Sequence, residues 1–110
     1  NGSNTGFAAG ANRAAETAWA AGMDALLLVN PDSVCDPGMV AALEAEAGAD
    51  PRLGACGPLV ARADDPGTIW AAGGAVDPVG RAVHHGAGQP LARASAAPVE
   101  VDYLPGCGLW

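Results

Sequence analysis

The stretch Ala25-Leu26-Leu27-Leu28-Val29-Asn30-Pro31-Asp32 decides the fold that the sequence predicts. Its first five residues form a short, continuous apolar run, which is typical of a strand covered on both faces. Pro31 cannot donate a hydrogen bond to a neighbouring strand, so we expect the chain to leave the sheet there. Asp32 would then lie just beyond the carboxyl end of a buried strand, where ligands bind in open α/β sheets.

The residues before this stretch predict a helix from Gly6 to Gly22. Alanine, the best helix former, is frequent here, and Gly22 stands where the end of a helix needs a left-handed backbone. One face of this helix would be made of small side chains and would sit close to a sheet. Its residues follow i, i+4, i+7, i+8 spacing and are Ala11, Ala15, Ala18 and Trp19.

The residues after the stretch predict a second helix and a second strand. Asp36-Pro37 would cap and start the helix, and Gly48 with the turn at Asp50-Pro51 would end it. The segment 53–60 is apolar enough for a strand but is interrupted by glycines. The order helix, buried strand, helix, strand predicts an α/β fold with a mostly parallel sheet and flanking helices.

The second half of the chain predicts a β-hairpin region. Short strand-like pieces alternate with turn sequences rich in glycine, aspartate and proline. The composition of residues 87–98 predicts a mobile loop, and a weakly alternating segment ends at Gly106-Cys107-Gly108. The expected strand pieces are 68–72, 74–76, 81–84 and 99–104.

Composition excludes several classes of protein. The 110 residues carry 12 acidic and 5 basic side chains, a net charge of −7, so a nucleic-acid binder is not expected. Half of the residues are hydrophobic, too many for a disordered acidic tail. No apolar run approaches the ~18 residues of a membrane span. The three cysteines, Cys35, Cys56 and Cys107, form no Cys-x-x-Cys motif, so we predict neither a disulfide framework nor a zinc site. This cysteine content predicts a protein of a reducing compartment.

Two polar clusters are candidate binding residues. Asn30 and Asp32 offer oxygen ligands beside a strand end, a chemistry suited to Mg²⁺ or Mn²⁺ bound to phosphates, although an Asx-turn is the simpler interpretation of Asp32 alone. The segment Asn4–Asn12 combines glycines with the start of a helix, which favours anions. Its Gly-x-x-x-Gly spacing differs from the dinucleotide-binding motif, and no strand precedes it.

Taken together, the two clusters resemble one known family. The sequence is similar to family 2 glycosyltransferases with the GT-A fold, especially the rhamnosyltransferase-like branch. Three segments carry the resemblance: Asn4-Thr5-Gly6-Phe7-Ala8-Ala9-Gly10-Ala11-Asn12, the alanine-rich helix, and the run ending in Asn30-Pro31-Asp32-Ser33. In that family this tripeptide stands in for the Asp-x-Asp metal motif. The resemblance covers nearly the whole chain, in the family's order, and continues through Gly57-Pro58, Ile69–Gly74, Asp77, Gly80 and Val101–Cys107.

The resemblance implies a fold and an activity. Residues 1–110 would be part of a single GT-A (nucleotide-diphospho-sugar transferase) domain that lacks its N-terminal nucleoside-binding strand and the downstream carboxylate that acts as general base. The activity would be inverting transfer of a sugar from a nucleotide-diphosphate donor to an acceptor hydroxyl, with Mn²⁺ or Mg²⁺. The acceptor would be a glycan or a lipid-linked glycan.

The resemblance also implies roles for individual residues. Asp32 would ligate the metal on the donor diphosphate, and Asn30 would lie near the ribose or the metal. Gly106 and Cys107 would lie near the sugar and the acceptor. The residues expected to line the donor pocket are Asn4, Gly6, Gly10 and Asn12.

Several alternatives stay open. A sugar-phosphate nucleotidyltransferase would share the sheet and the metal, and a non-catalytic glycosyltransferase-like module would only bind. The resemblance implies a cytoplasmic protein, including a peripheral position at the inner face of the cell membrane. Without the missing strand and base, we expect the 110 residues alone to be poorly soluble or to oligomerise, and to show no transferase turnover.

Other conspicuous residues have structural interpretations. Adjacent residues on a strand point to opposite faces, so His84 and His85 are not expected to form a metal pair. Packing is the better interpretation of Trp19 and Trp70, with a sugar platform left open for Trp70 in its hairpin. Cys107 has no basic neighbour in the sequence, which favours an inert thiol over a nucleophile.

Overall fold

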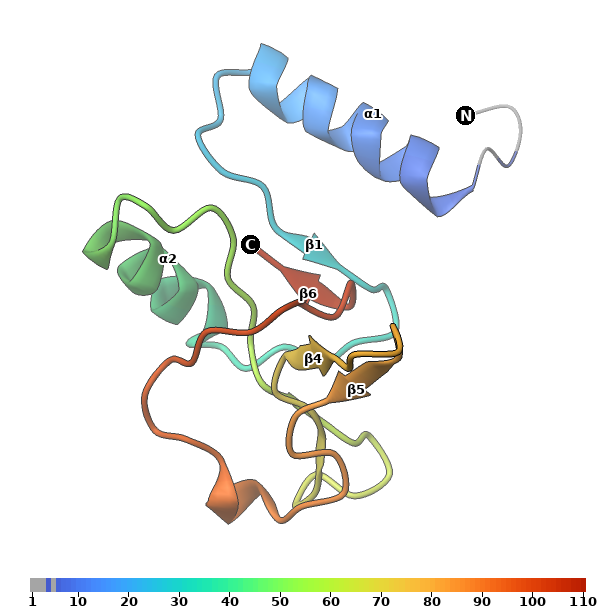
Figure 1. The fold of residues 1–110 in the computed structure, drawn as a ribbon. Helices are drawn as coiled ribbons and strands as arrows, with labels where there is room; N and C mark the ends of the chain where they lie inside the picture. The colour runs from blue at the N-terminus through green and yellow to red at the C-terminus, as the bar shows by residue number, and fades with distance from the viewer. Residues whose placement is uncertain (1–3, 5) are drawn as a thin grey trace.

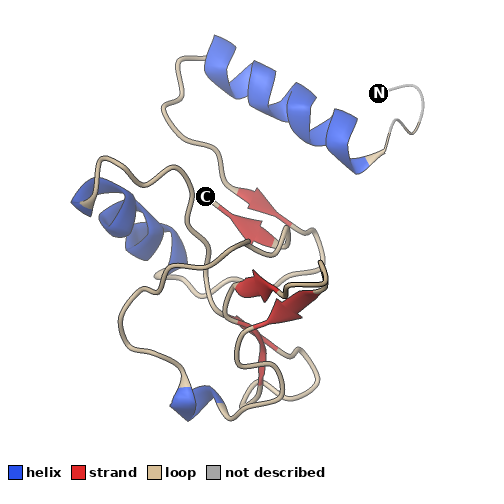
Figure 2. Cartoon of the chain, in the orientation of Figure 1, coloured by secondary structure: helices blue, strands red, loops and turns tan. Residues whose placement is uncertain are grey.

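The structure is a computed structural model that describes Asn4 and residues 6–110; Thr5, a member of the Asn4–Asn12 motif, and residues 1–3 lie outside the described residues. The described residues form two α-helices, one short 3₁₀-helix and several short strands, whose arrangement Figures 1 and 2 show. In chain order the elements are α1 (Phe7–Ala20), β1 (Leu28–Val29), α2 (Met39–Ala49), β2 (Val60–Ala61), β3 (Ile69–Ala71), β4 (Gly74–Val76), β5 (Ala82–His84), the 3₁₀-helix η1 (Leu91–Arg93) and β6 (Gly108–Leu109).

The strands form three separate antiparallel pairs: β1 with β6, β2 with β3, and β4 with β5. The predicted partial GT-A fold, a mostly parallel sheet with flanking helices, is therefore wrong for the described part of the chain. A parallel pair needs a crossover between its strands, and the segments on either side of α2 do not pair with each other. Instead β1 takes its partner from the C-terminal segment, with Leu28 opposite Leu109 and Val29 opposite Gly108.

The segment 53–60 shows why the parallel arrangement does not form. Only its last residue belongs to a strand, β2. Cys56 instead exchanges two backbone hydrogen bonds with Trp110, at 2.9 and 2.8 Å. Next to it, a Cβ on Gly57 would come within 2.8 Å of the carbonyl oxygen of Gly108. The glycine thus lets this segment lie against the C-terminal strand, where a longer side chain would hold the two backbones apart.

The apolar core is small and lies mostly under the hairpins. Among the described residues, the buried hydrophobic side chains are Leu43, Ile69 and Ala71, which are 6%, 2% and 0% exposed. The run around β1, predicted to be covered on both faces, is only half-buried, and Val29 is exposed. The two-residue strand has a partner on one side only, which leaves part of the leucine run open.

The predicted first helix is confirmed, as is its end. Gly22 has a φ of +78°, its N–H donates to Trp19, and the N–H of Met23 donates to Ala18 over 3.0 Å. These two bonds satisfy the last carbonyls of the helix in the Schellman pattern. Figure 1 shows α1 standing apart from the strands. Its half-buried side includes three of the four residues of the predicted small face, Ala11, Ala15 and Ala18.

The second helix begins later than predicted. Asp36 and Pro37 were expected to cap and start it, but regular helix starts at Met39, its N-cap residue is Gly38, and no side chain caps it. The Oδ1 atom of Asp36 instead accepts a hydrogen bond from the N–H of Gly38, 2.8 Å away, in the turn before the helix. The helix ends at Ala49, before the predicted turn at Asp50, so its predicted end is confirmed.

The hairpin of β4 and β5 is confirmed within a residue of the predicted pieces. The C-terminal segment lies across the start of this hairpin. Asp102 donates its N–H to the carbonyl of Gly74, 2.9 Å away, and the Asp102 carboxylate accepts a hydrogen bond from the N–H of Val76. The predicted strand 99–104 is absent from the described structure apart from a bridge at Tyr103. A strand forms instead at Gly108, where the sequence suggested a break.

Candidate functional site

Two predicted site segments, the turn after β1 and the turn before β6, are brought together by strand pairing. Asn30 donates its backbone N–H to the carbonyl oxygen of Cys107 over 3.4 Å, next to the Val29–Gly108 pair. Gly106 precedes this contact in the same turn. The sequence predicted these segments for the donor and acceptor sides of one site, and antiparallel pairing makes them neighbours.

The turn Asn30–Ser33 holds Asp32 at its outer corner. Ser33 donates its N–H to the carbonyl of Asn30 over 3.1 Å, which closes a four-residue turn. Pro31 occupies the second position, for which its fixed φ is suited. Asp32 is exposed, and within the described part of the chain its carboxylate has no hydrogen bond or ion pair. The turn therefore closes through the backbone, without an Asx-turn from Asp32, and leaves this carboxylate open.

The turn carries two oxygen groups that could hold a metal ion. The Asp32 carboxylate and the Asn30 amide oxygen are hard oxygen ligands of the kind that Mg²⁺ and Mn²⁺ take. Among the described residues, no group of three or more His, Cys, Asp and Glu side chains could enclose an ion. Mg²⁺ often uses one or two carboxylates and completes its shell with phosphate and water. An ion at this turn would therefore need further ligands from a bound molecule or from water.

The predicted donor-pocket residues near the N-terminus lie just before α1 or in its first turns. The Oδ1 atom of Asn4 accepts from the N–H of Gly6, 2.9 Å away, and Gly6 has a φ of +83° just before the helix. Gly10 and Asn12 lie within α1, and a Cβ on Gly10 would meet nothing within 4 Å. No hydrogen bond between described residues joins this group to the Asn30–Ser33 turn, so its part in the site stays a prediction.

The three cysteines are free, as predicted. Burial raises the pKa of the Cys56 thiol, and the nearby charge of Glu46 raises it further. Its Sγ lies 3.9 Å from the carbonyl of Leu43, under α2. Cys107 is half-buried beside Asn30. A thiol with a raised pKa is a poor nucleophile, so Cys56 is a packing residue.

Sequence reasoning missed one cluster of side chains: Trp70, His84 and Tyr103. The hydroxyl of Tyr103 lies 2.8 Å from Nδ1 of His84, and the Trp70 ring lies 4.6 Å from the His84 ring. His85 is exposed and takes no part in this cluster. The available signal was the alternation in β3, where Trp70 stands between buried Ile69 and Ala71.

No helix within Asn4 and residues 6–110 is long and apolar enough to cross a membrane. The chain matches none of the protein-family models, curated proteins or solved structures with which it was compared.

Proposed function

We propose that the chain carries the donor-binding part of a glycosyltransferase, which moves a sugar from a nucleotide-diphosphate donor to an acceptor hydroxyl. The supporting observation is the contact between Asn30 and Cys107, which unites the turn bearing Asp32 with the turn predicted for the sugar side. The resemblance of both turns to the same family, in the family's order, supports the same assignment. Because the described fold is not the predicted one, the proposal concerns these turns and not the architecture.

The local electrostatics explain why such a site would use a metal ion. The chain has a net charge of −7, and the arginines of three exposed ion pairs are already engaged by aspartates: Arg52 with Asp50, Arg62 with Asp64, and Arg81 with Asp77. A diphosphate would therefore meet a chain of net negative charge, in which three of the five guanidinium groups already have a carboxylate partner. Bound Mn²⁺ or Mg²⁺ would offset the charge that builds on the leaving diphosphate.

In the proposed reaction the acceptor oxygen forms a bond to the anomeric carbon as the bond to the diphosphate oxygen breaks. The configuration inverts, and the acceptor proton passes to a base that we assign to no described residue. Asp32 and Asn30 hold the diphosphate side, while the Gly106-Cys107 turn borders the sugar. We assign the reaction to the cytoplasm, where a lipid-linked acceptor would bring it to the inner face of the membrane.

The test is calorimetric titration of the chain with UDP and with dTDP, each with and without Mn²⁺. We expect binding that requires Mn²⁺ and falls at least about tenfold in Asp32→Asn, a loss of about 1.4 kcal/mol. The matched control is Asp24→Asn, which removes an exposed carboxylate that precedes β1 rather than follows it. Equal, metal-independent affinities in the parent chain and Asp32→Asn would overturn the proposal.

A further inference from the structure

The cluster of Trp70, His84 and Tyr103 is built around a glycine. Gly74 lies opposite His84 in the β4–β5 pair and exchanges backbone hydrogen bonds with the 102–103 segment. A Cβ on Gly74 would overlap the ring of Tyr103. The tyrosine ring therefore occupies the space of the missing side chain and reaches across to Nδ1 of His84. Three separate backbone segments therefore hold the side chains of this cluster in place.

Trp70 extends this cluster into solvent. Its neighbours Ile69 and Ala71 are buried on one side of β3, so Trp70 points to the other side. There its ring tilts at 48° to that of His84, which in turn lies 5.8 Å from the ring of Tyr103. Trp70 nevertheless remains 41% exposed. The indole therefore packs against the His84 ring and is still partly open to solvent, which makes it an amphipathic surface for a ligand.

We propose that Trp70 and His84 form a binding subsite for a neutral glycan. The C–H groups of a pyranose ring carry partial positive charge, which suits the negative face of the indole. Nδ1 of His84 is engaged by Tyr103, and its Nε2 has no hydrogen-bond partner among the described residues, so Nε2 is available to a sugar hydroxyl. Aromatic surface with a few placed polar groups is the usual composition of a small-ligand site.

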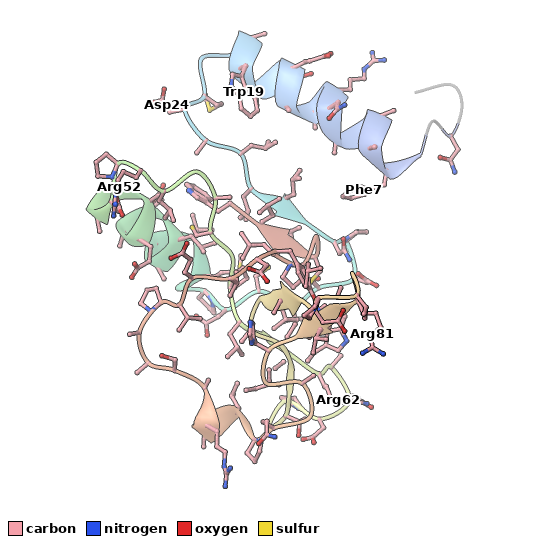
Figure 3. The ribbon with its side chains drawn as sticks, in the orientation of Figure 1. Phe7, Trp19, Asp24, Arg52, Arg62 and Arg81 are labelled. Atoms are coloured by element: carbon pink, nitrogen blue, oxygen red, sulfur yellow. The ribbon has the colours of Figure 1, made fainter. Side chains whose placement is uncertain are left out.

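The ligand is neutral because the surroundings offer no counter-charge for an anion. The nearest arginine of the hairpin, Arg81, is engaged by Asp77 through its Nε at 2.8 Å. Figure 3 shows Arg81 at the outer end of the hairpin. With a net charge of −7, the chain would repel a phosphorylated or acidic ligand at this face.

The subsite lies within reach of the Asn30–Cys107 contact. Tyr103 and Cys107 are four residues apart, so their Cα atoms are separated by at most about 14 Å. A short oligosaccharide on Trp70 could therefore present a terminal hydroxyl near the turn that carries Cys107. In this form the inference rests on the proposed function and deepens it, because it makes the glycan the acceptor.

The test is saturation-transfer NMR on the chain with methyl α-L-rhamnopyranoside and methyl β-D-galactopyranoside as probes. Saturation of the aromatic protons is expected to reach the C–H protons of at least one probe. Trp70→Ala should weaken binding about tenfold, while Trp70→Phe, which keeps a ring, should retain most of it. His84→Gln should weaken binding about fivefold through the lost hydrogen bond. Trp19→Ala, which removes another exposed tryptophan, should leave binding unchanged.

Absence of transfer to both probes, or equal transfer in Trp70→Ala with an unchanged ¹H–¹⁵N spectrum elsewhere, would overturn the subsite. Titration of the same samples with UDP and Mn²⁺ separates this outcome from failure of the proposed function. Loss of glycan binding with intact, Asp32-dependent nucleotide binding refutes only the subsite. Trp70-dependent glycan binding without nucleotide binding supports the subsite and refutes the transferase.

Discussion

The part of the chain before β2 and the hairpin part from β2 to Tyr103 are held in different ways. The first contains both α-helices, yet its only buried hydrophobic side chain among the described residues is Leu43, and α1 buries none. The second has almost no helix, but it contains buried Ile69 and Ala71 and a glycine pair closed over by the 101–103 segment. The α-helices and most of the tight packing thus occur in different parts of this molecule.

The part before β2 is therefore the open part of the molecule, and the hairpin part is the packed part. The two differ in which predicted functional residues they contain. The motif-bearing residues, from Asn4 to Asp32, lie in the open part, where side chains are exposed and few tertiary contacts constrain them. The cluster around Tyr103 lies in the packed part; Trp70 and Tyr103 belong to segments of the family resemblance, but no motif predicted that they meet. Figure 3 shows Phe7 and Trp19 at opposite ends of α1, on a helix well apart from the hairpins. The residues predicted to bind the donor thus lie in the open part, and the aromatic cluster lies in the packed part.

The largest expected effect comes from the packed part. Ile69→Ala removes a side chain that is 2% exposed, and such changes cost about 2–5 kcal/mol of unfolding free energy. Val29→Ala, on exposed β1, should cost less than about 1 kcal/mol. Urea unfolding followed by circular dichroism measures both. Equal losses would show that the two parts are packed alike.

Gly74→Ala tests the same contrast with the addition of a single methyl group. The added Cβ would overlap the ring of Tyr103, and overpacking of this kind costs about 1–3 kcal/mol. Gly106→Ala is the matched control, because a Cβ there meets nothing within 4 Å, and its effect should stay within about 0.5 kcal/mol. Equilibrium unfolding is again the measurement, together with the NMR signals of the Tyr103 ring. An unperturbed ring and unchanged stability in Gly74→Ala would contradict the close packing.

Local structure was readable from the sequence wherever neighbouring residues determine it. Gly22 ends α1 because only glycine takes the left-handed conformation cheaply, and α2 ends at Ala49, just before the turn predicted at Asp50. The hairpin of β4 and β5 follows from the turn residues between them. Each of these features depends on contacts within a few positions of the chain.

Pairing over long distances was not readable. The order of helices and strands suggested a parallel sheet, but β1 pairs with β6, which lay beyond an expected break at Gly106-Cys107-Gly108. The same pairing places Asn30 beside Cys107, so the juxtaposition of the site segments came from family resemblance and not from pattern. The Tyr103–His84 bond joins residues from separate segments through the space left by Gly74, and no periodicity encodes it.

Substitution within α1 is expected to change the free energy of unfolding by less, and in the stabilising direction. Gly10 has helical surroundings with open space at its Cβ position, so Gly10→Ala should stabilise the chain by about 0.5–1 kcal/mol. Gly6→Ala, at a φ of +83°, should instead destabilise it by about 1–2 kcal/mol. Thermal unfolding distinguishes the two. Destabilisation by Gly10→Ala would mean that α1 packs more closely than its exposure indicates.

The last prediction concerns pH and the turn of the β4–β5 hairpin. The Asp77 carboxylate accepts hydrogen bonds from the N–H groups of Arg81 and Val79 and from the Arg81 side chain, at 2.8–3.0 Å. These bonds favour the charged form, and the backbone bond from Arg81 contributes most, so the pKa of Asp77 lies below its ordinary value of 3.8. Because the folded-state pKa is the lower one, the carboxylate stabilises the fold above about pH 4. That contribution is lost as the pH falls below 3.8 and through the folded-state pKa.

The aspartates paired with Arg52 and Arg62 have pKa values lowered in the same direction, chiefly by bonds to those side chains. They bridge residues only two positions apart, whereas Asp77 ties together the two strands of a hairpin. Asp77→Asn should therefore flatten the decline in stability below pH 4 more than Asp64→Asn, although both changes should be small for exposed groups. Urea unfolding between pH 3 and 6, with the carboxyl carbon of Asp77 followed by NMR, measures both quantities. A titration midpoint for Asp77 at or above 3.8 would contradict the bonded turn, because an unbonded carboxylate gains nothing from being charged in the folded state.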